Sequence, residues 1–292
     1  MSKQRLREIV GFAIVTTDIA RLVRFYCEVL GFAAHGGERS LQLTELALLG
    51  LAGTGYRRVL SLGRQAIWID QFEPAGRVYP RAIDASSLGF QHLALVVSDM
   101  AEAYARVRDI NPISHGGPQT LPSTAGGARA FKFRDPDGHP LELLQFPTGK
   151  TPDAWKNARP FDGQIGLGID HSAISVVNAD ASVAFYGTLG LRAGKRALNQ
   201  GPAQQRLDGL AGVEVAVIPM LPSVETPHLE ILGYQVSKDR QGSAVRANDV
   251  AATRIVWRGR GAELIRDPDG HLQQIEAQRS GTPQFICSEQ RP

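Results

Sequence analysis

Two histidines and two glutamates occupy matching places in a tandem repeat and could together bind one metal ion. His92 and His171 each open an apolar stretch that leads to an acidic or amide residue suited to cap a helix. Glu142 and Glu230 each interrupt an otherwise apolar stretch. Burying an unpaired carboxylate is costly, so these positions indicate that a cation lies nearby. A single strand histidine is usually a hydrogen-bonded core residue, and the metal interpretation therefore depends on all four residues together.

Length and composition favour an ordinary intracellular globular protein. The 292 residues suggest about two domains, and 43% apolar with 21% charged residues is typical of that class. A net charge of +3 without a Lys/Arg run argues against nucleic acid as a partner. The N-terminus has no apolar signal core and no segment is long enough to cross a membrane, so we expect a cytoplasmic protein. Cys27 and Cys287 make no disulfide framework.

Internal repeats define the organisation of the chain. Three motifs each occur twice, residues 18–26 with 178–186, 50–53 with 209–212, and 135–139 with 267–271. The last pair is less widely separated than the others, which indicates that the second half has lost some chain. The Asp-Pro-Asp-Gly sequences of the last pair are turn signals, so we expect His139 and His271, which follow them, at the surface.

Each repeat predicts a βαβββ unit of an α+β fold. An apolar strand leads into a helix capped by Asp or Asn, and three strands joined by Gly/Pro/Asp turns follow. The four units span about 8–83, 88–147, 168–236 and 245–278, and the fourth has lost its helix. They form two halves, residues 1–147 and 168–292, joined by a linker at 148–167 in which Trp155 is expected to anchor the segment.

These motifs resemble the vicinal oxygen chelate superfamily. The resemblance lies in the strand-His-strand-Asp-helix-Phe-Tyr openings and in the closing strand Asp135-Pro-Asp-Gly-His-Pro-Leu-Glu142, and it covers nearly the whole chain. The superfamily includes glyoxalase I, methylmalonyl-CoA epimerase, extradiol dioxygenases, and bleomycin- and fosfomycin-resistance proteins. The resemblance implies that two units pair into a U-shaped sheet around a divalent metal, with ligands from the first and last strands of each unit.

Carrying the ligand positions over gives two competent units and two degenerate ones. The second unit supplies His92 and Glu142, and the third supplies His171 and Glu230. The corresponding residues are Gly11 and Trp68 in the first unit and Thr253 and Gln274 in the fourth.

Unit pairing decides whether the four ligands meet. If the first unit pairs with the second and the third with the fourth, each sheet holds one His and one Glu, which is too few for a tight site. If the second pairs with the third, all four converge and the first and fourth form the other sheet. We favour this arrangement because it leaves no buried carboxylate without a partner. Pairing across a homodimer would serve equally well.

The resemblance favours isomerase or lyase chemistry of the glyoxalase type. A His2Glu2 set suits Zn, Ni, Co, Mn or Fe. The ion would polarise a small substrate with adjacent oxygens, and Glu142 or Glu230 would move a proton at the neighbouring carbon.

Two alternatives remain open. Two histidines and one carboxylate would also suit an Fe(II) extradiol dioxygenase, with His228 and Tyr234 on the same strand face as Glu230. A metal-free protein of the resistance type, which sequesters a ligand, is the third possibility.

The polar segment 199–208 offers substrate contacts. Asn199, Gln204 and Arg206 could bind a carboxylate or hydroxyl group, together with Tyr234, although a solvated hairpin fits the segment as well.

Overall fold

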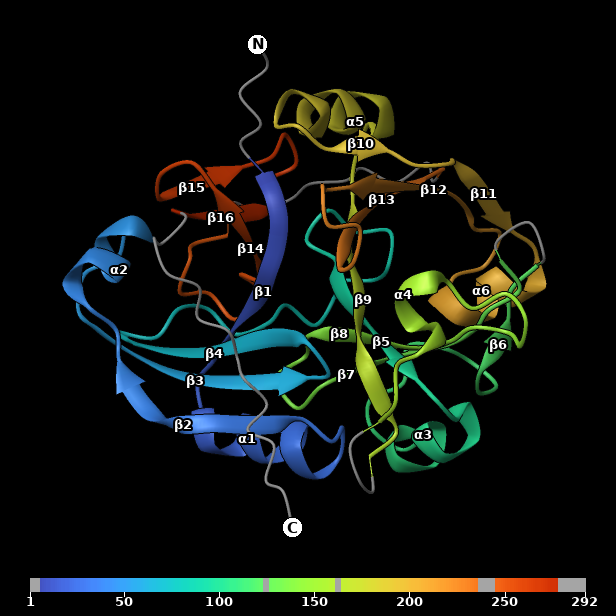
Figure 1. Cartoon of the computed structure of the whole chain (residues 1–292), viewed down its shortest axis with the longest axis horizontal. Coiled ribbons are helices and arrows are strands. Elements are labelled where there is room, and N and C mark those ends of the chain that lie inside the picture. The colour runs from blue at the N-terminus through green and yellow to red at the C-terminus, as the bar shows by residue number, and fades with distance from the viewer. Residues whose placement is uncertain (1–5, 123–125, 161–163, 236–244, 278–292) are drawn as a thin grey trace.

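The structure, a computed structural model, consists of two mixed β-sheets packed back to back, with helices at the periphery (Figure 1). It describes residues 6–122, 126–160, 164–235 and 245–277, so Cys287 lies outside the described residues. In this part of the chain no helix has the length and apolarity needed to span a membrane.

The first and fourth units share the seven-stranded sheet. Its strand order is β15 (Glu263–Arg266), β16 (Leu272–Ala277), β14 (Arg254–Gly259), β1 (Leu6–Thr16), β4 (Gln65–Glu73), β3 (Thr54–Leu62) and β2 (Ala33–Ser40). The strands β1 and β14 run antiparallel and join the two units at the centre of the sheet. Residues 260–262, all of them described, lead from β14 into β15 without a helix, as the sequence indicated.

The second and third units share the nine-stranded sheet. Its main order is β10 (Arg192–Ala193), β12 (Glu214–Leu221), β13 (His228–Tyr234), β9 (Gly166–Ser175), β5 (Gln91–Val97), β8 (Pro140–Gln145), β7 (Arg129–Arg134) and β6 (Gln119–Thr120), and β11 (Ala197–Gln200) pairs with β12. The antiparallel pair β5 and β9 joins the units. The unit pairing favoured from the sequence is therefore the one that the chain adopts.

Helices α1 (Ile19–Glu28), α3 (Met100–Val107) and α5 (Ala179–Thr188) belong to the first three units. Their caps Asp18, Asp99 and Asn178 each accept a hydrogen bond from a backbone N–H in the first turn, as the motif predicted. Three shorter helices complete the structure, α2 (Leu43–Leu48), α4 (Asp153–Lys156) and α6 (Pro202–Asp208). Helix α4 lies within the expected linker, whose bounds stay a prediction.

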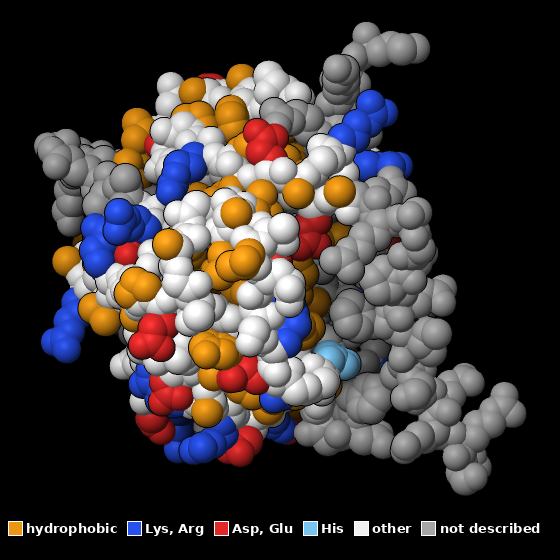
Figure 2. Space-filling view, turned by 90° about the vertical axis from the view of Figure 1, so that its left-hand side faces the viewer, with side chains coloured by type: hydrophobic (Ala, Val, Ile, Leu, Met, Phe, Trp, Pro, Cys, Tyr) orange, Lys and Arg blue, Asp and Glu red, His pale blue; other side chains and the backbone are white. Residues whose placement is uncertain are grey.

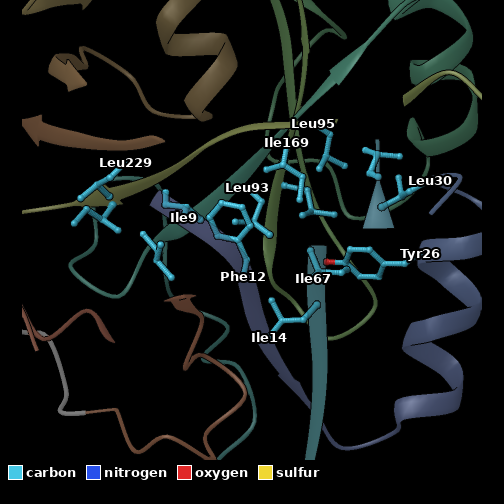
Figure 3. Packing of buried hydrophobic residues seen from close by; sticks show 14 of the residues in the cluster. Ile9, Phe12, Ile14, Tyr26, Leu30, Ile67, Leu93, Leu95, Ile169 and Leu229 are labelled. Carbon is cyan, nitrogen blue, oxygen red and sulfur yellow. The ribbon is translucent and has the colours of Figure 1, made fainter. Parts of the chain in front are cut away.

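The main core lies between the two sheets (Figure 3). Phe12 of β1 and Ile67 of β4 pack toward Leu93 and Leu95 of β5. Because side chains alternate along a strand, His92 points to the opposite, concave face of its sheet. Burial of the apolar positions thus fixes which residues face the concave side.

Matching polar contacts connect the units across the molecule. Tyr26 of α1 donates to Asp135 at 3.2 Å, and Tyr186 of α5 donates to Asp267 at 2.9 Å. The two aspartates are in the Asp-Pro-Asp-Gly turns, whose backbone they also hold. The Phe-Tyr motifs therefore provide a buried hydrogen bond as well as packing.

The expected exposure of His139 and His271 is wrong, because they are only 2% and 7% exposed. The Nε2 atom of His139 lies 2.9 Å from the carbonyl oxygen of Val250, and that of His271 lies 3.0 Å from the carbonyl of Ser175. Each histidine thus satisfies a carbonyl of a distant unit, which a turn motif by itself does not reveal.

Strand register identifies the degenerate positions of the seven-stranded sheet. In the nine-stranded sheet Ala94 of β5 is paired with Glu142 on one side and His171 on the other. In the seven-stranded sheet Ala13 of β1 is paired with Trp68 and Arg254. Trp68 therefore matches Glu142 as expected, whereas the counterpart of His171 is Arg254.

The sequence alignment that matched Thr253 to His171 is one residue out of register, because the strand pairing gives Arg254. Gln274 pairs with Val256, two residues beyond Arg254, just as Glu230 pairs with Ala173, two residues beyond His171. The equivalence of Gln274 thus holds, and only its partner changes.

In the seven-stranded sheet, the charged side chain of Arg254 takes the position that His171 has in the other sheet. Its guanidinium donates to Asp70 and to Gln274, and Arg57 donates to both oxygens of Asp70 at 2.6 and 2.8 Å. Asp70 and Arg254 are fully buried. Burial lowers the pKa of Arg254 to about 10, against the opposing effect of Asp70. An ion-pair cluster therefore occupies the place that corresponds to the His/Glu group of the other sheet.

The surface on the left-hand side of Figure 1 carries both acidic and basic side chains. Figure 2, which views the left-hand side of Figure 1, shows acidic and basic side chains interspersed with small apolar areas. The described part of this face thus has no large patch of one sign.

Replacing Asp70 by Ala should destabilise the fold by about 3–5 kcal/mol, because it leaves two buried guanidinium groups without their carboxylate. Chemical denaturation would measure this change. Arg192→Ala is the matched control, since Arg192 and Glu225 form a pair in which both side chains are 65% exposed. It should cost less than about 1 kcal/mol. Equal effects of the two substitutions would contradict the structural role of the cluster.

Candidate metal centre

The four sequence-predicted ligands lie on the concave face of the nine-stranded sheet. His92 is on β5, Glu142 on β8, His171 on β9 and Glu230 on β13, the four central strands of that sheet. All four line one cavity of about 250 Å³. The alternation that buries Leu93 and Leu95 in the core turns these four polar side chains the other way.

Three of the four side chains form a compact group. The ligand atoms of His92, Glu142 and His171 all lie within 4.8 Å of one another. Nε2 of His92 is 3.3 Å from Oε2 of Glu142, and Nε2 of His171 is 3.5 Å from Oε2 of Glu230. Glu230 completes the set from the far side of His171 and is the most accessible of the four, with 18% of its side chain exposed.

The bonding state of His92 fits a metal ligand. Both of its ring nitrogens are buried, and within the described residues neither has a hydrogen-bond partner. Burying a polar group without a partner costs about 1–3 kcal/mol. A cation between His92 and its neighbours would satisfy one of the two nitrogens, so the residues present fit a divalent ion.

A β-bulge in β9 orients His171. The pairing of β9 with β5 passes from His171 to Ile169 and leaves Asp170 as the extra residue, so that Asp170 and His171 both line the cavity. Oδ2 of Asp170 lies 3.0 Å from Nδ1 of His171. A carboxylate at Nδ1 favours the tautomer that presents Nε2 as a ligand.

The linker contributes to the same arrangement. Trp155, only 5% exposed, donates from Nε1 to Oδ1 of Asp170 at 2.5 Å. The expected anchor therefore contacts the carboxylate that holds His171.

Electrostatics distinguishes the two histidines. Burial, with a further effect of Lys132, places the pKa of His92 well below its ordinary value. Burial also opposes charge on His171, but Glu230 and Asp170 raise its pKa to about 9. At neutral pH the metal-free site therefore holds one neutral and one protonated imidazole.

The two glutamates also differ. Burial raises the pKa of Glu142, although Lys132 acts against it. For Glu230 the burial effect is outweighed by His171 and His228, and its pKa is lowered. Glu142 is thus the better proton acceptor of the pair when the site holds no cation.

Of the predicted substrate contacts, Asn199, Gln204 and Tyr234 line the cavity. Arg206 does not line it and donates instead to Gln119 at 2.7 Å. The alternative of a solvated hairpin for segment 199–208 does not hold, because β11 ends at Gln200 and helix α6 follows. The helix turns Gln204 inward and places Arg206 on another side.

His228 lies beside the group and not in the cavity wall. It pairs with His171 across β9 and β13, and the two ring centres are 5.4 Å apart. Its Nε2 is 3.6 Å from Oε1 of Glu230. The catalytic role predicted for His228 stays a prediction, and its observed contact is with a candidate ligand.

Sequence reasoning missed a buried ion pair at the cavity. Lys132 of β7 donates to Asp208 of α6 at 2.7 Å and lies 3.6 Å from Glu142. Lys132 stands between Phe131 and Phe133 in an apolar strand, which is the signal that could have identified it. Asp208 gave no comparable signal, because it comes from a helix of the neighbouring unit.

Comparisons with known proteins find similarity in sequence and in fold. Residues 8–143 match the family model described as Glyoxalase/Bleomycin resistance protein/Dioxygenase superfamily. A virulence protein of Salmonella typhimurium is 28% identical over 138 residues, which are 46% of this chain and 80% of the relative.

Two solved structures share the fold across both halves. Glyoxalase I from Zea mays superposes with a TM-score of 0.53 at 15% identity, covering 92% of each chain. A candidate dioxygenase from Bacillus subtilis gives a TM-score of 0.55 at 13% identity, covering 94% of this chain and 86% of the other. The family match thus covers residues 8–143, and both solved structures share the fold over at least 92% of this chain.

Proposed function

We propose that this protein is a metal-dependent isomerase or lyase of the glyoxalase type, which moves a proton at a carbon next to a carbonyl or hydroxyl group. The observation that carries the proposal is the convergence of two histidines and two glutamates on one cavity, with His92 buried and lacking a hydrogen bond among the described residues. This donor set suits a divalent ion with one or two positions left for substrate oxygens.

His92, Glu142, His171 and Glu230 would hold the ion, and Zn, Ni, Co, Mn and Fe all suit such ligands. When bound, the ion supplies Lewis acidity that polarises a carbonyl and stabilises negative charge on adjacent substrate oxygens. Asp170 keeps His171 in the required tautomer through the contact at Nδ1.

The remaining lining suits a small molecule. Apolar side chains such as Leu144, Val215 and Leu232 form part of the cavity wall. Asn199 and Tyr234 add polar groups that can orient hydroxyl or carbonyl oxygens. A carboxylate of Glu142 or Glu230 would take the proton from the substrate carbon and return it at the adjacent carbon.

A second candidate is Fe(II)-dependent ring cleavage of the extradiol type. His228 beside His171, and Tyr234 in the cavity wall, favour it because they add a histidine and a phenol close to a two-His-one-carboxylate group. The fourth candidate ligand, Glu230, counts against it, because it occupies a position that oxygen would need.

Elemental analysis of the purified protein should find about one equivalent of a divalent metal per chain, since only one of the two concave faces offers the ligand set. His92→Ala and His171→Ala should each lose most of it, because each removes one of the four donors. His35→Ala, on the exposed strand β2, is the control and should keep the metal. If both site variants retain the wild-type content, the shared site is wrong. Lack of metal even after reconstitution would favour the ligand-sequestering alternative.

Proton transfer can be followed directly. With small α-hydroxycarbonyl compounds in D2O, the metal-loaded protein should exchange the proton next to the carbonyl, as NMR would show. Glu142→Gln or Glu230→Gln should reduce the rate by about 10²–10⁴-fold for whichever residue is the base. Anaerobically loaded Fe(II) protein that consumes O2 with catechols and exchanges no proton would instead establish the dioxygenase.

Metal affinity should depend on pH through His171. Because its pKa is raised to about 9, the ion must displace a proton at neutral pH. Apparent affinity should thus rise about tenfold per pH unit from pH 7 toward 9 and then level off. Asp170→Asn should shift the plateau to lower pH, because it removes one of the charges that hold the proton. An affinity independent of pH between 7 and 9 would show that His171 is not a ligand.

A further inference from the structure

The two glutamates occupy equivalent strand positions but face different neighbours. In the second unit the residue paired with Glu142 on the adjacent strand is Lys132. In the third unit the residue paired with Glu230 is Pro219. The other two units have Val59 and Leu264 at this position. Lys132 is therefore the only charged residue at this place in the four units, and it breaks the symmetry of the site.

Lys132 is held firmly where it is. Only 3% of it is exposed, and its ammonium donates to Oδ1 of Asp208 at 2.7 Å. The other oxygen of Asp208 accepts from Gln204 at 2.7 Å and from the Tyr234 hydroxyl at 3.0 Å. This buried array contains residues of both the second and the third unit. The position of the ammonium is thus set by the pairing of the two units.

From this position the ammonium lies next to one glutamate. Its Nζ is 3.6 Å from Oε2 of Glu142, within reach after a small side-chain movement. The neighbours of Glu230 are instead the imidazoles of His171 and His228, at 3.5 and 3.6 Å. A fixed ammonium and a divalent ion repel each other and compete for the same carboxylate. Glu142 therefore has a second cation to which it can turn, and that cation is not a candidate ligand.

We propose that Lys132, fixed by Asp208, is a positioning residue that makes Glu142 the exchangeable ligand, able to leave the metal for the ammonium, while Glu230 remains bound. This inference rests on the proposed function, since it assigns roles within the same site. Glu142 is then the base. The substrate C–H bond breaks, its electron pair stays on the substrate, and the proton passes to a Glu142 oxygen and returns at the adjacent carbon. No oxidant or reductant is consumed.

Zn(II) affinity, measured by competition with a chromophoric chelator, tests this assignment. In the wild-type background Glu230→Gln should weaken binding roughly tenfold more than Glu142→Gln, because Lys132 already weakens the hold of Glu142 on the metal. The variant Lys132→Met/Asp208→Asn removes both members of the ion pair, so that no buried charge is left alone. It should bind Zn(II) roughly tenfold more tightly than the wild type.

The decisive comparison is a pair of double-mutant cycles. In the Lys132→Met/Asp208→Asn background, Glu142→Gln should become as costly as Glu230→Gln, whereas the cost of Glu230→Gln should not change. The single variant Lys132→Arg keeps the positive charge and should therefore bind Zn(II) with the wild-type affinity. Thermal melting of each variant verifies that it is folded before its affinity is compared.

The outcomes separate this inference from the proposed function. If the wild type binds no Zn(II), the metal site itself is wrong. Another outcome is that the wild type binds Zn(II) while Glu142→Gln and Glu230→Gln weaken binding equally in both backgrounds. The role assigned to Lys132 is then wrong, but the metal site is correct. Weaker binding by the Lys132→Met/Asp208→Asn variant would indicate a merely structural ion pair and would also overturn the inference.

Discussion

The two concave faces of this molecule are governed by one constraint, namely that a carboxylate taken out of water must have a cation beside it. The seven-stranded sheet meets it with the guanidinium groups of Arg254 and Arg57 around Asp70. The nine-stranded sheet buries Glu142 and Asp208, and the Lys132 ammonium is the cation that lies beside both of them. The carboxylate of one face is thus paired by two guanidinium groups, whereas the other face holds several carboxylates that the proposed divalent ion would balance. The repeats that generated both faces have diverged in how they balance charge, while the backbone pairing around them is retained.

The geometry of the retained site depends on parts of the chain that are far from it in sequence. The bulge in β9 brings Asp170 to the same side as His171, and the linker residue Trp155 fixes that carboxylate. On the other side, α6 carries Asp208 across the unit boundary to Lys132. Sheet-to-sheet contacts between the Tyr residues of the helices and the aspartates of the turns hold the frame. The candidate ligands are thus held in place by these contacts, and binding of the proposed ion would require little rearrangement.

The sequence predicts the units, the order of their elements and the four candidate ligands, because each of these leaves a local pattern that recurs in the chain. Pairing could be inferred only through an energetic argument about buried Glu142 and Glu230. The features that were missed arise between units. The imidazole of His139 is buried because its Nε2 contacts the carbonyl oxygen of Val250, which is 111 residues away in the sequence. Arg254 and not Thr253 is the counterpart of His171, because Ala13 pairs with Arg254 just as Ala94 pairs with His171, and this pairing across units leaves no local pattern in the sequence. Lys132 and Asp208 form an ion pair only when the second and third units pack together, and no spacing in the sequence predicts this contact.

The nesting of the units has a consequence for biosynthesis. Strand β1 emerges from the ribosome long before β14, with which it pairs, and the contact between Glu8 and Arg258 joins residues 250 positions apart. The second and third units lie between them in the chain, so the nine-stranded sheet can assemble while the edge of β1 is still open. Such an unpaired edge is a template for association with another chain, and distant pairings form slowly. A nascent chain that stalls before β14 would therefore already contain the complete His/Glu cavity, but it would expose the strand on which the other sheet is built.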